Sequence, residues 1–242
     1  MNLEPASISQ AGGRKINEDS CAVFHRPPYS CFVVADGLGG HGSGDVASQA
    51  AIKAIASSFS SQPDYSAEKL NGYIEVAQRD ILLLQSSQSR YRNMRTTVVL
   101  LVSDGRQAAW AHVGDSRLYM FRDYKLLAHT LDHSVPQALV RMGEITFEQI
   151  RFHEDRNRLL QALGSEDPPK IETLAQAVDL QKGDAFLLCS DGFWEWVLEE
   201  EMEKTLARAK SPAQWLEFMG QILLGKAKPG HDNYTAVGVY VS

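Results

Sequence analysis

Aspartates at the ends of apolar runs are the residues in this sequence best suited to chemistry. Asp36-Gly37 follows the run VVA, Asp115-Ser116 follows HVG, and Asp191-Gly192 follows FLLCS. Asp232-Asn233 comes just before YTAVGVYV, and Asp19 comes just before Ser20. Taken singly, each acid is more often a turn or cap residue. Their joint occurrence suggests a site, because capping does not require an apolar strand to end on Asp so often.

Converging carboxylates would need cations, because they cannot all stay ionised within a few ångströms of one another. All-oxygen ligands without paired His or Cys favour Mg²⁺ or Mn²⁺ over Zn²⁺ or copper. Two such ions would ionise a water, orient a phosphate and stabilise the charge of an in-line displacement. Hydrolysis of a phosphoester is therefore the reaction class that the residues indicate.

The stretch from Val33 to Gly42 is the most specific of these patterns. A β-branched run stops on Asp36, and four glycines occur in the next six residues. Such a turn is sterically bare, so a cation or phosphate can approach its backbone closely. The alternative is a tight strand-to-helix loop in which Asp36 only caps the following helix.

Arg14 and His41 are the candidate residues that are not acids. Arg14 lies in a Gly-rich segment shortly before Asp19, where its guanidinium could present a fork to two phosphate oxygens. A surface salt bridge is the alternative. His41 could protonate the leaving alkoxide or orient water, and a plain loop histidine is its alternative. His112, His133 and His231 each lie close to a candidate acid in sequence, which predicts hydrogen bonds to ligands or substrate.

Hydrophobic patterning predicts how these residues are held. Helical spacing of apolar residues predicts helices over 45–59, 66–85, 199–209 and 211–224, with two shorter helices around a hinge within 134–153. Strands are expected over 21–24, 31–35, 96–102, 107–113, 118–121, 125–128, 170–174 and 235–241, and in a run that starts at 185 and ends on Asp191. Short turns between neighbouring strands predict antiparallel pairing. The expected fold is an α+β sandwich of two sheets with helices outside.

Composition limits the class of protein further. A chain of 242 residues can form one domain, and a net charge of -6 argues against an extended nucleic-acid surface. Acidic residues in the first thirty positions and apolar runs of strand length predict no secretion signal and no membrane span. Three cysteines without a Cys-x-x-Cys pair are expected to be reduced thiols in a cytoplasmic protein.

Taken together, the motifs resemble the bacterial metal-dependent Ser/Thr phosphatases of the protein phosphatase 2C family. The resemblance covers almost the whole chain in the right order. Its motifs are Arg14-x-x-Asn17-Glu18-Asp19, Val34-Ala35-Asp36-Gly37-Leu38-Gly39-Gly40-His41, Thr96-Thr97, Val113-Gly114-Asp115-Ser116-Arg117, Asp132-His133-Ser134, Ala162-Leu163-Gly164, Ser190-Asp191-Gly192 and Asp232-Asn233-x-Thr235. Two positions depart from the usual pattern: Arg95 stands where relatives place Gly, and Leu38 replaces the commoner Met.

The resemblance implies a four-layer αββα sandwich: two antiparallel sheets flanked by antiparallel helix pairs, as one catalytic domain over residues 1–242. It implies two Mn²⁺ or Mg²⁺ ions and a weaker third. Asp36 would bridge the two ions, the Gly37 carbonyl would complete one, and Asp191 with Asp232 would hold the other. Asp19 would act mainly through bound water, and Asp115 with Asp191 would form the third site. Arg14 would bind the phosphate.

The same resemblance implies a phosphoserine/phosphothreonine phosphatase in which metal-activated water attacks directly. No Cys-x5-Arg loop is present for a tyrosine-phosphatase mechanism. Residues 135–155 resemble a mobile flap that shapes substrate access. The expected partners are phosphorylated proteins and a cognate Ser/Thr kinase. Two alternatives are a non-catalytic phosphoprotein-binding module and a hydrolase of small phosphoesters.

Overall fold

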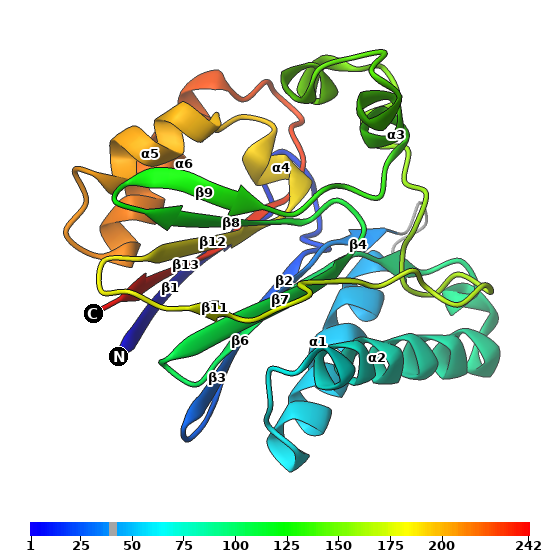
Figure 1. The fold of residues 1–242 in the computed structure, drawn as a ribbon. Helices are drawn as coiled ribbons and strands as arrows, with labels where there is room; N and C mark the ends of the chain where they lie inside the picture. The colour runs from blue at the N-terminus through cyan, green and yellow to red at the C-terminus, as the bar shows by residue number, and fades with distance from the viewer. Residues whose placement is uncertain (39–42) are drawn as a thin grey trace.

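Two antiparallel sheets lie face to face in the computed structural model, which describes residues 1–38 and 43–242 (Figure 1). The first sheet has the order β1-β13-β12-β8-β9. Its strands are β1 (Leu3–Gln10), β13 (Tyr234–Val241), β12 (Ala185–Cys189), β8 (Arg117–Arg122) and β9 (Lys125–His129). Every neighbouring pair in this sheet is antiparallel.

The second sheet has the order β10-β7-β6-β3-β2, and β11 also pairs with β7. Its strands are β2 (Ser20–Arg26), β3 (Tyr29–Ala35), β6 (Val98–Ser103), β7 (Gln107–Val113), β10 (Glu172–Thr173) and β11 (Val178–Asp179). A separate two-stranded ribbon joins β4 (Gly37–Leu38) to β5 (Arg95–Thr96). This ribbon extends β3 beyond Ala35 toward the site.

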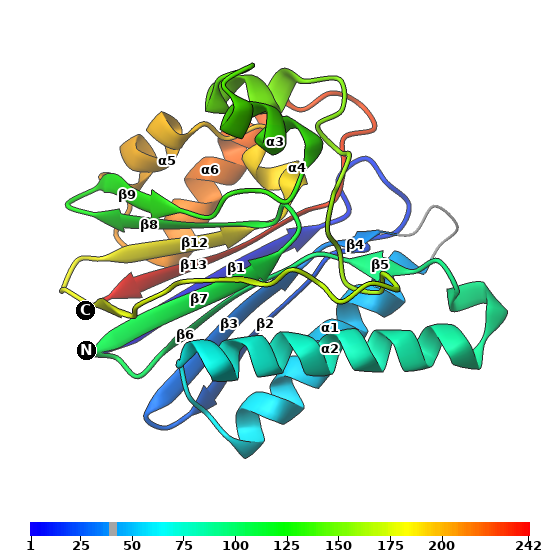
Figure 2. The ribbon, with the colours of Figure 1, turned by 45° about the vertical axis from the view of Figure 1, so that its right-hand side comes forward.

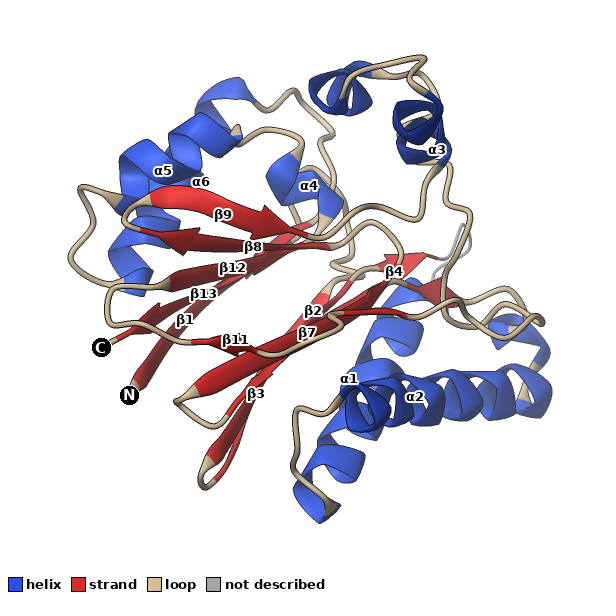
Figure 3. Ribbon diagram, in the orientation of Figure 1, coloured by secondary structure: helices blue, strands red, loops and turns tan. Residues whose placement is uncertain are grey.

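Helices cover the outer face of each sheet, as the helix and strand colouring of Figure 3 shows. The pair α1 (Gly44–Ser61) and α2 (Ala67–Ser87) packs on the second sheet, and α5 (Glu199–Leu206) with α6 (Pro212–Lys226) packs on the first. The view in Figure 2 separates the resulting four layers. The expected αββα sandwich is therefore confirmed.

The remaining helices are short and lie near one end of the sandwich. They are η1 (Ser89–Tyr91), α3 (Val135–Met142), η2 (Phe147–Phe152) and α4 (Asp191–Trp194). The expected pair of helices around a hinge corresponds to α3 and η2, separated at Gly143, whose φ of 76° suits glycine. Ser134 caps α3 by accepting a hydrogen bond from the Gln137 amide.

Apolar side chains between the sheets hold the two halves together. Phe32 and Val34 of β3 and Val99 and Leu101 of β6 are buried against side chains of the first sheet, among them Leu188. Side chains of a strand alternate between its two faces. Both faces of these strands are covered, so their sequences are continuous apolar runs. A polar residue at the end of such a strand is carried to the rim of the core.

The strand register brings the candidate acids to one end of the sandwich. Cys189 pairs with Ala236, so the residues after β12 and before β13 lie side by side. In the other sheet, Val34 pairs with Val99, and Val98 pairs with Val113. The chain therefore leaves β3 and β7 at this same end (Figure 1).

Several elements differ from the sequence-based expectation, among them β1, β10, β11 and α4. β1 was not expected, and it pairs along its whole length with β13 at the far end of the chain. The strand expected over 170–174 is only the two-residue β10. A helical turn, α4, starts directly at Asp191 where only a turn was expected.

Candidate active site

A cavity of about 460 Å³ opens where the four acid-bearing segments meet. Its lining comes from the N-terminal loop, the end of β3 with β4, the turn after β7, the segment after residue 155, the end of β12 and the residues just before β13. The lining residues are Arg14, Lys15, Ile16, Glu18, Asp36, Gly37, Leu38, Asp115, Asn157, Leu159, Asp191, Asp232 and Asn233. Four of the five predicted acids therefore face one space, with Arg14 beside them.

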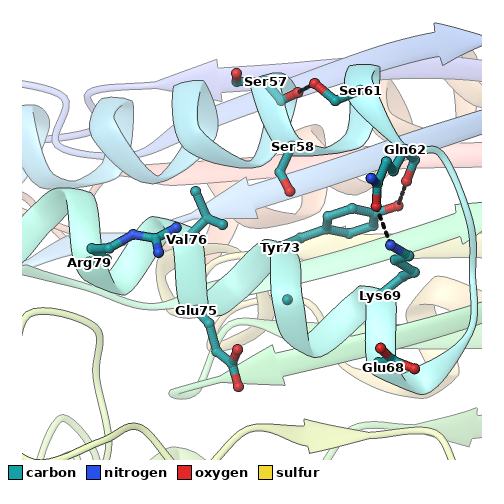
Figure 4. Close-up of a pocket in the computed structure, with 11 residues that line it drawn as sticks. Ser57, Ser58, Ser61, Gln62, Glu68, Lys69, Tyr73, Glu75, Val76 and Arg79 are labelled. Carbon is teal, nitrogen blue, oxygen red and sulfur yellow. Dashed lines mark hydrogen bonds between the residues drawn. The ribbon is translucent and has the colours of Figure 1, made fainter.

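A larger cavity of about 600 Å³ lies between α1 and α2 (Figure 4). The Ser58 hydroxyl of α1 points toward Tyr73 of α2 there, and the Ser61 hydroxyl donates to the Ser57 carbonyl. Glu75 points away from these serines in Figure 4. Because this lining brings no set of acids together, the acidic cavity is the better candidate site.

Two threonines fix the backbone of Asp36. The Asp36 amide donates to Thr97 Oγ1 over 3.1 Å, and the Thr97 amide donates back to the Asp36 carbonyl over 2.9 Å. Thr96 Oγ1 donates to the same carbonyl over 2.8 Å. The carboxyl of Asp36 is therefore delivered by β3 and held in place from β5 and β6.

Gly37 is required by close backbone packing. A Cβ built on it would lie 2.1 Å from the Gly44 carbonyl oxygen and 2.5 Å from that of Glu18. The Gly37 amide donates to the Glu18 carbonyl, and Glu18 Oε1 accepts the Gly44 amide at the start of α1. Sequence reasoning gave Glu18 no role of its own, although it lies in the Asn17-Glu18-Asp19 motif. The structure shows that Glu18 ties the N-terminal loop to α1 beneath this turn.

Asp19 lies buried beside the cavity and is fixed by a serine. Ser190 Oγ donates to Asp19 Oδ2 over 2.7 Å and accepts the Thr235 amide over 3.0 Å. Burial, followed by the charges of Asp191 and Asp232, raises the pKa of Asp19 to about 7. Without a cation, the ionised form of Asp19 is therefore destabilised by its surroundings in the folded protein.

Asp191 and Asp232 are held together by close contact of their chain segments. A Cβ on Gly192 would lie 2.0 Å from the Asn233 carbonyl oxygen. Asn233 accepts the Glu18 amide on Oδ1 and donates from Nδ2 to the carbonyl of Ile16. The side chain of Asn233 thus fixes the N-terminal loop against the residue that follows Asp232.

Arg14 reaches the acidic cluster directly. Its Nη2 lies 2.8 Å from Asp232 Oδ2, and both side chains are partly exposed at the cavity. The sequence left open whether Arg14 serves the site or forms a surface salt bridge. The observed ion pair places its guanidinium at the site, with N–H groups left over for a ligand.

Trp194 holds the backbone of Asp115, and the ring of Trp194 packs against the buried ion pair between Arg117 and Asp132. Trp194 Nε1 donates to the Asp115 carbonyl over 2.9 Å. The Arg117 guanidinium lies 3.5 Å from the centre of the Trp194 ring and forms two 2.7 Å hydrogen bonds to Asp132. Arg117 and Asp132 are each 1% exposed, so this ion pair is shielded from solvent. Sequence reasoning quoted both residues within motifs without pairing them.

The electrostatics of the cluster match a cation site. Burial raises the pKa of Asp36, and the charges of Asp19, Asp191 and Asp115 raise it further. Burial also raises the pKa of Asp115, with Asp191 adding to the effect, and that of Asp191, with Asp232 adding to it. Carboxylates that repel one another in a cavity are stabilised by divalent cations, and an all-oxygen donor set suits Mn²⁺ or Mg²⁺.

The histidines do not lie as expected. His41 falls outside the described residues. His112 Nε2 contacts the Leu131 carbonyl, His133 lies between the Gly114 amide and Glu172, and His231 contacts the Lys228 carbonyl. None of these four contacts reaches a candidate acid, so the structure shows no hydrogen bond from these histidines to a predicted metal ligand, and contact with a substrate stays a prediction. Backbone carbonyl and amide groups supplied nearer partners.

His112, His133 and Glu172 lie close enough together to raise the question of a separate metal site. The two imidazole rings stack with their centroids 4.7 Å apart and 22° between their planes. In-plane nitrogen lone pairs of stacked rings run side by side and do not meet at one ion. The group is better explained as a brace between β7, β10 and the start of α3.

Comparison with known proteins agrees with the geometry. The sequence profile described as protein phosphatase 2C matches residues 9–226. The serine/threonine phosphatase stp of Listeria monocytogenes is 34% identical over 232 residues, which cover 93% of this chain and 90% of that protein. The Mycobacterium tuberculosis phosphatase PstP/Ppp has a TM-score of 0.85 at 30% identity over 99% of both chains. A structure of the PstP catalytic domain in complex with two manganese ions has a TM-score of 0.83 at 30% identity, covering 98% and 97%.

Proposed function

Because the chain belongs to the protein phosphatase 2C family and is a serine/threonine phosphatase, we propose that its acidic cavity is the catalytic site for phosphoserine and phosphothreonine side chains. The whole chain, residues 1–242, would act as one catalytic domain. Five aspartates and one arginine carry the proposal, because separate segments bring Arg14 and four of the aspartates to one cavity and place Asp19 beside it. Metal dependence fits the family.

We assign the carboxylates as ligands of two Mn²⁺ or Mg²⁺ ions. Asp36 would bind both ions, the Gly37 carbonyl would complete one, and Asp191 with Asp232 would hold the other. When bound, such ions ionise water near neutral pH and place positive charge against the phosphoryl oxygens. Asp19, which is held by Ser190, would act mainly through bound water at the edge of the cluster. Asp115 and Asp191 would form a weaker third site.

Arg14 is the proposed phosphate-binding residue. Its guanidinium lies at the mouth of the cavity, where a fork of N–H donors matches two phosphoryl oxygens. Binding the phosphate there orients the phosphorus for in-line attack and compensates charge on its oxygens. Lys cannot present this bidentate geometry.

His41 is proposed as the general acid, on sequence grounds alone. Its position after the glycine turn would let it protonate the leaving Ser or Thr alkoxide. Leaving-group protonation matters little for p-nitrophenolate, a good leaving group, and much for an alkoxide. Replacing His41 with Asn should therefore slow hydrolysis of a phosphothreonine peptide far more than that of p-nitrophenyl phosphate.

The biological setting is a further part of the proposal. No helix in the described residues is long and apolar enough to cross a membrane. We propose that the protein works in the cytoplasm on phosphorylated proteins and reverses a cognate Ser/Thr kinase. The flap, residues 135–155, would shape which phosphoprotein reaches the cavity.

Activity on two substrates with and without metal tests the proposal. A phosphothreonine peptide and p-nitrophenyl phosphate are incubated with the protein in Mn²⁺ and in EDTA. Turnover of both in Mn²⁺ and of neither in EDTA is expected. Turnover of the small ester without turnover of the peptide would instead indicate a hydrolase of small phosphoesters.

A further inference from the structure

A second groove lies next to the catalytic cavity, under the end of the flap. It has a volume of about 420 Å³ and lies between the last residues of the flap, the segment after α4 and the end of α6. Arg156 lines this groove, and its neighbour Asn157 lines the catalytic cavity. Neighbouring residues of one segment thus line the groove and the catalytic cavity, so a peptide bound with its phosphorylated residue among the aspartates has its flanking residues near the groove.

Four cationic side chains and one carboxylate line the groove, in a chain whose net charge is -6. The cations are Arg151, Arg156, Lys226 and Lys228, and Lys226 is already paired with Glu201 over 2.6 Å. Lys228 forms no ion pair within residues 1–38 and 43–242. Arg156 uses only Nε for its 2.9 Å bond to Glu195, so its terminal nitrogens are left for a ligand.

The guanidinium of Arg151 lies in the wall of the groove, and one of its nitrogens has no hydrogen-bond partner in the part of the chain that the structure describes. Its side chain is only 3% exposed and is held by a hydrogen bond from Nη2 to Glu199. Its Nη1 is buried and has no hydrogen-bond partner among the described residues. An unpaired buried donor costs free energy in the unliganded protein.

The rim of the groove is apolar and exposed. Phe152, directly after Arg151, is 81% exposed, and Leu198 on the opposite side is 41% exposed. An exposed aromatic ring beside charged donors is typical of a protein-binding surface. It would cover the main chain of a bound peptide while the cations bind its side chains.

We propose that this groove docks an acidic segment of the phosphoprotein substrate, next to the phosphorylated residue. The inference rests on the proposed function and specifies its substrate class. Carboxylates of Glu or Asp side chains pair with Lys228 and with the terminal nitrogens of Arg156. The groove thereby selects among phosphoproteins while the aspartate cluster performs the reaction.

A matched pair of phosphothreonine peptides tests this selection. One carries three Glu residues on each side of the phosphothreonine, and the other carries Gln at the same six positions. The wild-type protein should prefer the Glu peptide by about tenfold in kcat/KM, mainly through KM. Raising the salt concentration should reduce the preference, because it screens exposed charges.

Charge reversal at Lys228 tests whether the preference for the Glu peptide arises in this groove. Lys228→Glu should bring the ratio of the two kcat/KM values to about one and leave turnover of p-nitrophenyl phosphate unchanged. Lys182→Glu makes the same charge change in the exposed turn before β12, at the other end of the sandwich, and should keep the full preference. Neither lysine has an ion-pair partner in the described part of the chain, so both variants should fold.

Fluorescence anisotropy of a labelled, unphosphorylated Glu peptide supplies a readout independent of turnover. Binding that Lys228→Glu weakens and Lys182→Glu does not supports the groove. Equal hydrolysis of both peptides by the wild type, or an equal loss for both peptides in Lys228→Glu, would overturn the inference while leaving the phosphatase intact. Failure to hydrolyse either peptide or the small ester would refute the proposed function, and anisotropy would still decide whether the groove docks acidic peptides.

Discussion

Replacing Asp19 with Asn should stabilise the metal-free protein and reduce its response to metal. The pKa of Asp19 is raised from 3.8 to about 7, chiefly by burial. Between these values the folded state binds more protons than the unfolded state, so the free energy of unfolding falls as pH rises through this window. Fully above pH 7, a shift of this size corresponds to about 4 kcal/mol of lost stability.

The Asn variant removes that charge and keeps an oxygen to accept the bond from Ser190. At pH 8 in EDTA we expect it to be more stable by about 2 to 4 kcal/mol, because some of the relief is offset by the desolvated amide group. For a chain of this size the melting temperature should rise by roughly 8 °C. At pH 4, where Asp19 is protonated, the difference should disappear.

Thermal unfolding by circular dichroism at pH 4 and pH 8, each in EDTA and at pH 8 also in saturating Mn²⁺, measures both effects. Wild type should gain stability from Mn²⁺, and the variant should gain less, because it has lost one charge of the cluster. Asp123→Asn is the matched control, since Asp123 is exposed at a φ of 51° that Asn tolerates. A variant less stable than wild type in EDTA at pH 8 would refute the electrostatic reasoning.

Three further substitutions test the geometry. Arg14→Lys should lower kcat/KM for a phosphothreonine peptide roughly tenfold to a hundredfold, mainly by raising KM, because the bidentate contact is lost; unchanged kinetics would exclude Arg14 from phosphate binding. Gly37→Ala should lower the melting temperature and weaken Mn²⁺ binding measured by calorimetry, because its Cβ would lie 2.1 Å from the Gly44 carbonyl oxygen. Arg117→Met should destabilise the fold by about 3 to 5 kcal/mol in urea titrations, since it leaves Asp132 buried and unpaired; a change below 1 kcal/mol would contradict the buried pair.

The strands and the acids at their ends could be predicted because both are local properties of the sequence. An apolar run that stops on Asp36 or Asp191 must place that carboxyl at the rim of the core, whatever the pairing. β1 was missed because Pro5 interrupts its pattern and Pro weakens the prediction of a strand. Its pairing with β13 depends on residues more than 200 positions away, which local periodicity does not report.

The interactions that hold the acids in place could not be predicted in the same way. Ser190 reaches Asp19, and Trp194 reaches the Asp115 carbonyl, across long separations in the sequence. The resemblance to a known family grouped these residues by motif but did not give their contacts. The histidines show the opposite case, because nearness in sequence to an acid suggested contacts that the fold does not make.

The most direct test of the account is turnover of a phosphothreonine peptide by wild type and Asp36→Asn across a Mn²⁺ titration, with EDTA as the zero point. The account predicts activity only in wild type with Mn²⁺, and a loss of roughly a thousandfold or more in Asp36→Asn, whose neutral amide is a poor ligand for two cations. Circular dichroism would confirm that the variant is folded. Turnover that survives both EDTA and Asp36→Asn would contradict a catalytic metal site built on this aspartate.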